Sequence, residues 1–213
     1  MNSRTVILTL AAAFVVIGAY VAWPRQADLR AFRPAAIARL ETAMWRDYYD
    51  KRYGALFYHL YELSRTQFGF SPLDSFRIAL AAARAARAFQ PTRSREAADA
   101  ALPSLVTYYR LLASAVPGSF DIAEAARLEL DWWQARREAV GPGQYGVTVA
   151  RVAAITYGKP ADDPSLLISG IGRAEAMAYR DARGQAVTDP DWSEIECRLR
   201  RAYRSLKAAV ADG

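Results

Sequence analysis

The chain has 213 residues, of which 53% are hydrophobic, 12% aromatic and 23% charged, a composition that excludes a disordered protein. Its length suits one compact domain. A single cysteine excludes a disulfide framework and a cysteine-cluster zinc site, and a single histidine excludes the paired Glu-x-x-His ligands of a di-iron bundle. The net charge of +6 is spread among interleaved acids, so we expect no nucleic-acid partner.

The chain opens with an uncharged stretch between Arg4 and Arg25. Residues 5–23 would form a helix of about 28 Å, close to the hydrocarbon thickness of about 30 Å of a bilayer. Tyr20 and Trp23 stand at the distal end, where aromatic rings prefer the membrane interface, and Pro24 ends the helix. The pattern predicts a membrane anchor over residues 1–23.

A cleaved signal peptide is the competing interpretation of this stretch. Cleavage after Ala22 would put the bulky Tyr20 at the −3 position, which favours an uncleaved, single-pass anchor. The arginines after the stretch favour a cytoplasmic position for the following domain, although the opposite orientation remains open. These arginines are Arg25, Arg30, Arg33 and Arg39.

Residues 24–33 are predicted as a juxtamembrane linker, and residues 34–213 as one helical domain. An amphipathic pattern runs from Pro34 to about Gln67 and slips at 50–54, so it predicts one kinked helix or two. Ser71, Pro72 and Asp74 form a helix start signal, and the helix that follows would end at Phe89.

Further start and stop signals divide the remaining chain. The predicted helices cover 94–115, with a kink or restart at Pro103, and then 121–140, 145–157, 164–183 and 190–210. No stretch alternates long enough between apolar and polar residues to indicate a strand. The predicted fold is therefore all-α, with a single N-terminal transmembrane helix followed by a compact bundle of six or seven helices.

Charged residues interrupt the apolar faces of three predicted helices, and aromatic residues lie beside them. Because a buried ion without a partner is very costly, such charges must pair if they lie inside. One interpretation is an ion-pair network that sets helix register. A second is a pocket in which arginine and tyrosine receive an anionic or polar ligand and tryptophan forms a wall, and a third is that the charges are solvated. The candidate binding residues are Glu41, Arg46, Tyr49, Glu129, Trp133, Arg136, Arg173 and Asp181.

Other chemistry-bearing residues give no catalytic signature. His59 and Glu62 share a helical face, but a hydrogen-bonded histidine is the favoured interpretation over a metal ligand or acid/base pair. Cys197 has no neighbour that would activate its thiol. Phosphate loops, dinucleotide turns and nucleophile elbows are absent from the sequence. We predict no catalytic residue, no metal site and no cofactor, and whether the protein is an enzyme stays open.

Three segments carry a resemblance to a group of uncharacterised bacterial proteins that place a hydrophobic N-terminus before a helical domain. The segments are ETAMWRDYY at 41–49, ELDWWQARR at 129–137 and RAEAMAYRD at 173–181. The resemblance covers most of the chain after the anchor and implies that the three segments act together. It implies no substrate, cofactor or activity.

These observations predict a non-enzymatic, membrane-anchored helical module of a bacterial cell. We expect it to contact the membrane through residues 5–23 and to bind a partner protein or stabilise a membrane complex; its oligomeric state is not predicted. The alternative is a ligand or enzyme site between the helices that carry Glu41, Glu129 and Arg173, which requires those residues to converge on a cavity.

Overall fold

A computed structural model describes residues 3–23, 25–116 and 118–211, and all regular structure in these ranges is helical. The all-α prediction is thereby confirmed for this part of the chain. Pro24, the predicted end of the first helix, lies outside the described residues. The α-helices are α1 (Ser3–Ala22), α2 (Pro34–Tyr49), α3 (Tyr53–Gln67), α4 (Pro72–Phe89), α5 (Arg95–Ala98), α6 (Leu102–Ala113), α7 (Ile122–Arg137), α8 (Pro142–Tyr157), α9 (Pro164–Asp181) and α10 (Asp189–Ala211).

Side-chain caps explain where several helices begin. The backbone N–H of Asp74 donates to Ser71 Oγ at 3.0 Å before α4, and that of Glu124 donates to Asp121 Oδ1 at 2.9 Å before α7. Asp163 caps α9 in the same way, accepting from Leu166 N–H at 3.0 Å. Such caps satisfy N–H groups that have no partner within the helix, so these helix starts can be read from the sequence.

The predicted number of six or seven helices in the bundle is too low. The pattern over residues 34–67 divides into α2 and α3, because Lys51 has a left-handed backbone (φ 58°) that no helix continues through. The predicted helix 94–115 also divides, into α5, a 3₁₀ turn at Asp99–Ala101, and α6. Pro103 lies in the first turn of α6, where a missing N–H costs nothing, so it starts a helix and does not kink one.

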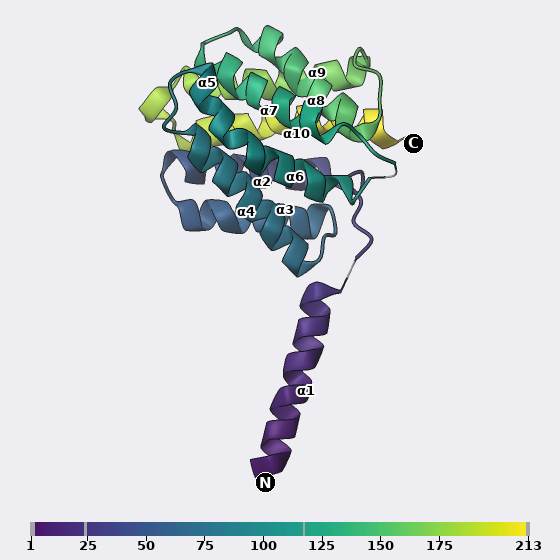
Figure 1. Cartoon of the computed structure of the whole chain (residues 1–213). Coiled ribbons are helices and arrows are strands. Elements are labelled where there is room, and N and C mark those ends of the chain that lie inside the picture. Colours follow the sequence, from purple (N-terminus) through teal and green to yellow (C-terminus); the bar gives the residue numbers. More distant parts are fainter. Residues whose placement is uncertain (1–2, 24, 117, 212–213) are drawn as a thin grey trace.

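The predicted transmembrane span is wrong. Among the described residues, no helix is both long enough and apolar enough to cross a membrane. A span takes about 20 predominantly apolar residues, whereas α1 has 20 residues in all and its first seven include Ser3, Arg4, Thr5 and Thr9. Figure 1 shows α1 extending away from the body. Near the end of this helix, the Tyr20 hydroxyl accepts a hydrogen bond from Arg65 at 3.2 Å.

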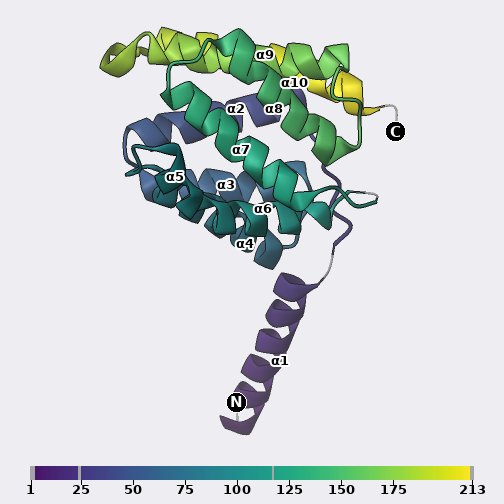
Figure 2. The same cartoon turned by 45° about the horizontal axis from the view of Figure 1, so that its top comes forward.

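The other long helices form a closed ring. Each of α2, α3, α4, α6, α7, α8, α9 and α10 packs against the next in this order, and α10 packs against α2. Figure 2 shows α9 and α10 along one side of the body and α3, α4 and α6 along the other, while α5 lies at one end. A ring of this kind has an axis surrounded by side chains from every helix in it, and one charged residue from each of α2, α7 and α9 lies at that axis.

Two glycines set the spacing of α8 and α9. A Cβ placed on Gly170 would lie 2.4 Å from the carbonyl oxygen of Gly146 and 2.6 Å from the backbone nitrogen of Ala150. A Cβ on Gly146 would lie 2.6 Å from Cα of Ile171. Because only glycine allows the two backbones to approach so closely, this contact fixes the position of Arg173, one turn after Gly170.

The segment predicted as a linker packs against one end of the ring. Leu29 and Phe32 are buried, with 2% and 1% of their surface exposed. The backbone N–H of Asp28 donates to the carbonyl of Phe68 at 2.9 Å, and Tyr157 donates its hydroxyl to the carbonyl of Leu29 at 3.1 Å. Residues 25–33 therefore form part of the body.

Candidate functional site

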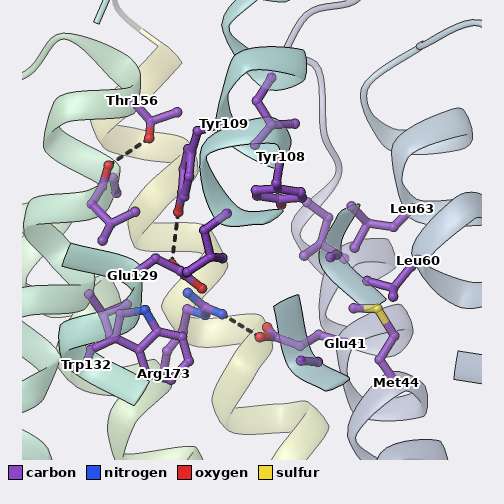
Figure 3. Close-up of a pocket in the computed structure, with 18 of the residues that line it drawn as sticks. Glu41, Met44, Leu60, Leu63, Tyr108, Tyr109, Glu129, Trp132, Thr156 and Arg173 are labelled. Atoms are coloured by element: carbon purple, nitrogen blue, oxygen red, sulfur yellow. Dashed lines mark hydrogen bonds and ion pairs between the residues drawn. The ribbon is translucent and has the colours of Figure 1, made fainter. Parts of the chain in front are cut away.

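A cavity of about 400 Å³ occupies the axis of the ring. Every helix of the ring contributes to its wall, as does Leu29 from the N-terminal segment. Most of the wall is aliphatic or aromatic, and Figure 3 shows Met44, Leu60 and Leu63 on the side opposite Trp132. The charged residues of the wall are Glu41, Glu129 and Arg173, which are the three that the ligand-site alternative requires to converge.

Glu41 and Arg173 form an ion pair between α2 and α9. Nη2 of Arg173 lies 2.5 Å from Oε1 of Glu41, and Tyr203 of α10 donates its hydroxyl to Oε2 at 2.5 Å. The Glu41 side chain is only 6% exposed and that of Arg173 is 23% exposed. Burial disfavours the charged guanidinium, but the Glu41 carboxylate outweighs this effect and raises the pKa of Arg173. Burial raises the pKa of Tyr203, which therefore stays a neutral donor.

Glu129 has neutral hydrogen-bond donors. Tyr109 donates its hydroxyl to Oε2 at 2.9 Å, and Trp133 donates Nε1–H to Oε1 at 3.0 Å. Burial is the main cause that raises the pKa of Tyr109, and the negative charge of Glu129 is the second. This hydroxyl therefore also stays protonated. The Trp133 ring meets Phe89 edge to face with centroids 5.1 Å apart, which holds the indole in place.

Arg173 lies between the two carboxylates, as Figure 3 shows. With both glutamates ionised and one arginine, the charged groups of the cavity wall sum to a formal charge of −1. Two fully buried donors of the wall residues have no acceptor among the described residues, namely Nε of Arg173 and Nε1 of Trp132. Because these two nitrogens have almost no accessible surface, they lie behind the wall and do not face the open space.

Three other predicted site residues form a separate cluster beside α9. Nε and Nη2 of Arg136 donate to the two carboxylate oxygens of Asp181 at 2.9 and 2.8 Å, and Arg136 also donates to the Tyr49 hydroxyl. Arg180 stacks on the Tyr49 ring, with Cζ 3.1 Å from the centroid. Burial opposes the charge of Arg136, but the hydrogen bonds that its guanidinium donates to Asp181 outweigh this effect and raise the pKa of the guanidinium.

Arg46, the last predicted site residue, lies outside both groups. Its Nη2 pairs with Asp189 Oδ1 at 2.8 Å, and both side chains are exposed, at 45% and 79%. The structure thus places Glu41, Glu129, Trp133 and Arg173 at the cavity wall and the other four predicted residues elsewhere.

His59 pairs with Asp47 and not with Glu62. Its Nδ1 lies 2.7 Å from Oδ2 of Asp47, whose other oxygen pairs with Arg52 at 2.9 Å. The described residues contain no group of three or more histidine, cysteine or acidic side chains that could hold a metal ion. His59 therefore joins the end of α2 to α3.

Sequence reasoning missed Tyr203 and Trp132 as parts of the site. Tyr203 follows Leu199 by four residues and precedes Leu206 by three, so the apolar spacing of the last helix places it on the buried face. Trp132 is 8% exposed and belongs to the core. Its spacing in the sequence shows burial but cannot show that its indole N–H lacks an acceptor.

Comparisons with known proteins add no family to this description. No protein-family model, no curated protein and no solved structure matches the chain. The resemblance drawn from the segments at 41–49, 129–137 and 173–181 accordingly stays a prediction.

Proposed function

We propose that the protein binds one small, mainly apolar molecule in the cavity at the axis of the helical ring. The observation that carries this proposal is the cavity itself, about 400 Å³ in volume, with apolar and aromatic walls and a few charged groups on one side. Ligand sites in proteins have volumes of about 300–1,000 Å³ and the same mixture of apolar walls and few polar groups.

The cavity argues against the interpretation that the charged residues serve only to set the register of the helices. Protein interiors pack as densely as organic crystals, and their voids rarely exceed one water molecule. Ion pairs that served only to hold helices together would be surrounded by close-packed side chains. Glu41 and Arg173 instead border an open space. This arrangement favours a ligand site over a purely structural network.

The test is binding of the uncharged fluorescent probe N-phenyl-1-naphthylamine to the full chain. Ala83 and Ala86 of α4 line the cavity, so the double variant Ala83→Leu/Ala86→Leu fills part of it while keeping a good helix former. We expect the Kd of the probe to rise about tenfold or more in this variant. Ala208→Leu, at an exposed position of α10, is the matched control and should bind as the parent does.

Equal probe binding by the parent and the cavity-filling variant would refute the proposal, as would a parent protein that binds no probe. Circular dichroism and urea unfolding of each variant establish that it is folded. Native mass spectrometry of the purified full chain gives an independent measurement, because a retained ligand appears as added mass on the parent and is missing from the filled variant.

A protein partner that binds α1 is a second candidate function. Large apolar side chains are exposed along this helix, including Leu8 at 70%, Phe14 at 74% and Val15 at 71%, and such exposure is typical of interaction sites. The triple variant Leu8→Ser/Phe14→Ser/Val15→Ser should lose a partner that co-purifies with the parent in mild detergent. Ile168→Ser, at a position 60% exposed on α9, is the control and should retain that partner. A parent that purifies alone would contradict this candidate.

A further inference from the structure

The charged residues of the cavity wall allow the chemical class of the ligand to be narrowed, an inference that rests on the function proposed above. The two carboxylates of the wall differ in their partners. Glu41 forms an ion pair with Arg173, at 2.5 Å between Oε1 and Nη2. In the part of the chain that the structure describes, Glu129 forms no ion pair, and its partners are the neutral Tyr109 hydroxyl at 2.9 Å and the Trp133 indole N–H at 3.0 Å. The wall thus contains one carboxylate that no cation of the described chain neutralises.

The Glu129 carboxylate can accept further hydrogen bonds. Each of its oxygens accepts one bond and keeps a second lone pair free. Glu129 is only partly exposed, and it lines the cavity. A carboxylate removed from bulk water is costly unless a cation pairs with it, and neutral donors compensate this cost only in part. A ligand that carries both a positive charge and N–H groups would supply what this carboxylate lacks.

Four aromatic residues of the cavity wall gather beside this carboxylate. Tyr109 and Trp133 donate to it directly. The Tyr108 ring contacts the Tyr109 ring, with centroids 5.2 Å apart, and the Trp132 ring contacts the Trp133 ring, with centroids 6.1 Å apart. All four residues line the cavity. Because aromatic rings attract cations, and attract them more strongly away from water, this part of the wall suits a positively charged group.

We infer that the ligand is a protonated alkyl amine, whose ammonium group pairs with Glu129 beside the aromatic rings and whose apolar part lies against α3. Figure 3 shows Leu60 and Leu63 of α3 on the side of the cavity away from Glu129, and these leucines offer no polar group to the ligand. The ammonium group would bring the formal charge of the wall from −1 to zero, whereas an anionic ligand would add a second uncompensated negative charge. The sign of this charge therefore favours a cation over the anionic ligand that the sequence pattern allowed.

The experiment compares three ten-carbon ligands in competition with N-phenyl-1-naphthylamine on the full chain at pH 7. Decylamine is protonated at this pH, 1-decanol is neutral and decanoate is an anion. Of the three, 1-decanol is the least costly to remove from water, so tighter binding of decylamine requires a specific partner in the cavity. We expect decylamine to bind at least about tenfold more tightly than either of the others. Binding of 1-decanol or decanoate that is as tight as that of decylamine would overturn the inference.

The variant Glu129→Gln tests the carboxylate directly, because it removes the charge and keeps the length of the side chain. Its affinity for decylamine should fall about tenfold or more, while its affinity for 1-decanol should change by less than about threefold. Glu124→Gln, at an exposed position of the same helix that does not line the cavity, is the matched control and should leave both affinities unchanged. An unchanged affinity for decylamine in Glu129→Gln would overturn the inference, and so would an equal loss for both ligands, which would assign Glu129 a packing role.

Failure of this inference can be distinguished from failure of the proposed function. A parent protein that binds the probe but does not prefer decylamine refutes the inference and leaves the cavity as a ligand site. A parent that binds no probe refutes both. The comparison of ligands on the parent does not depend on whether Glu129→Gln folds, and retained probe binding by this variant shows that its cavity is intact.

Discussion

Two ion-pair clusters share helix α9 about two turns apart, and they differ in how completely they are paired. At the inner cluster, Arg173 pairs with a Glu41 side chain that is 6% exposed, and it keeps a buried donor without an acceptor. At the outer cluster, Arg136 holds both oxygens of an Asp181 side chain that is 41% exposed. Similar residues thus complete a bidentate ion pair at the surface, and in the interior they leave one nitrogen of Arg173 without an acceptor.

The largest effect should come from removing the inner cation. Arg173→Met leaves the buried Glu41 carboxylate with only the Tyr203 hydroxyl, and we expect a loss of about 3–5 kcal/mol in the free energy of unfolding. Urea unfolding followed by circular dichroism measures this loss. The double variant Glu41→Gln/Arg173→Met should recover at least half of it, because no buried charge remains unpaired. A single variant that loses less than the double variant would contradict this account of the inner cluster.

An intermediate effect is expected at high pH from Tyr145, which lies between the clusters and donates its hydroxyl to the Ala174 carbonyl at 2.7 Å. Burial raises the pKa of Tyr145 to about 12, above the value of about 10 in an unfolded chain. The folded state thus favours the protonated phenol, so this contribution is complete below pH 10 and is lost as the pH rises from 10 to 12.

The expected loss is about 2 kcal/mol over this pH range. Tyr145→Phe should be about 1 kcal/mol less stable than the parent at pH 8, because the Ala174 carbonyl loses its donor. The difference in stability between the two proteins should then shrink and change sign as the pH rises toward 12, because the loss in the parent exceeds its initial advantage. Urea unfolding of both proteins at pH 8, 10 and 11.5 measures it, and a constant difference would be inconsistent with a raised pKa at Tyr145.

The smallest effect should come from the outer cluster. Arg136→Gln removes a pair whose Asp181 partner is largely solvated, so screening limits the expected loss to about 0.5–1 kcal/mol. The same variant should leave probe binding in the cavity unchanged, since Arg136 does not line it. A loss as large as that of Arg173→Met would remove the distinction between the two clusters.

Local signals in the sequence located most helices. Ser71, Asp121 and Asp163 each cap a helix where their pattern predicts one, because capping depends only on residues within one turn. Local signals were less reliable where the same sequence pattern is compatible with two different structures. Lys51 adopts a left-handed backbone that no propensity indicates, and the uncharged N-terminal stretch predicted a span that the described helix does not provide.

The candidate site was partly predictable, because buried charges must find partners. The identity of those partners depended on contacts between distant residues: Arg173 is 132 positions from Glu41, and Tyr203 is 162 positions from it. Helix periodicity indicates which face of a helix is buried but not which helix lies opposite. The closure of the ring by α10 against α2, and the space that it leaves at the axis, arise only from the complete tertiary arrangement.

The glycine contact between α8 and α9 also limits how a molecule could reach the axis. With Gly146 and Gly170 in backbone contact, these two helices cannot separate without breaking their closest packing. Helix α3 is held less firmly, since its fully buried residues are the polar Ser64 and Gln67. We therefore expect α3 to move away from its neighbours when a molecule enters the cavity. Its backbone amides should exchange with solvent deuterium faster than those of α8 and α9.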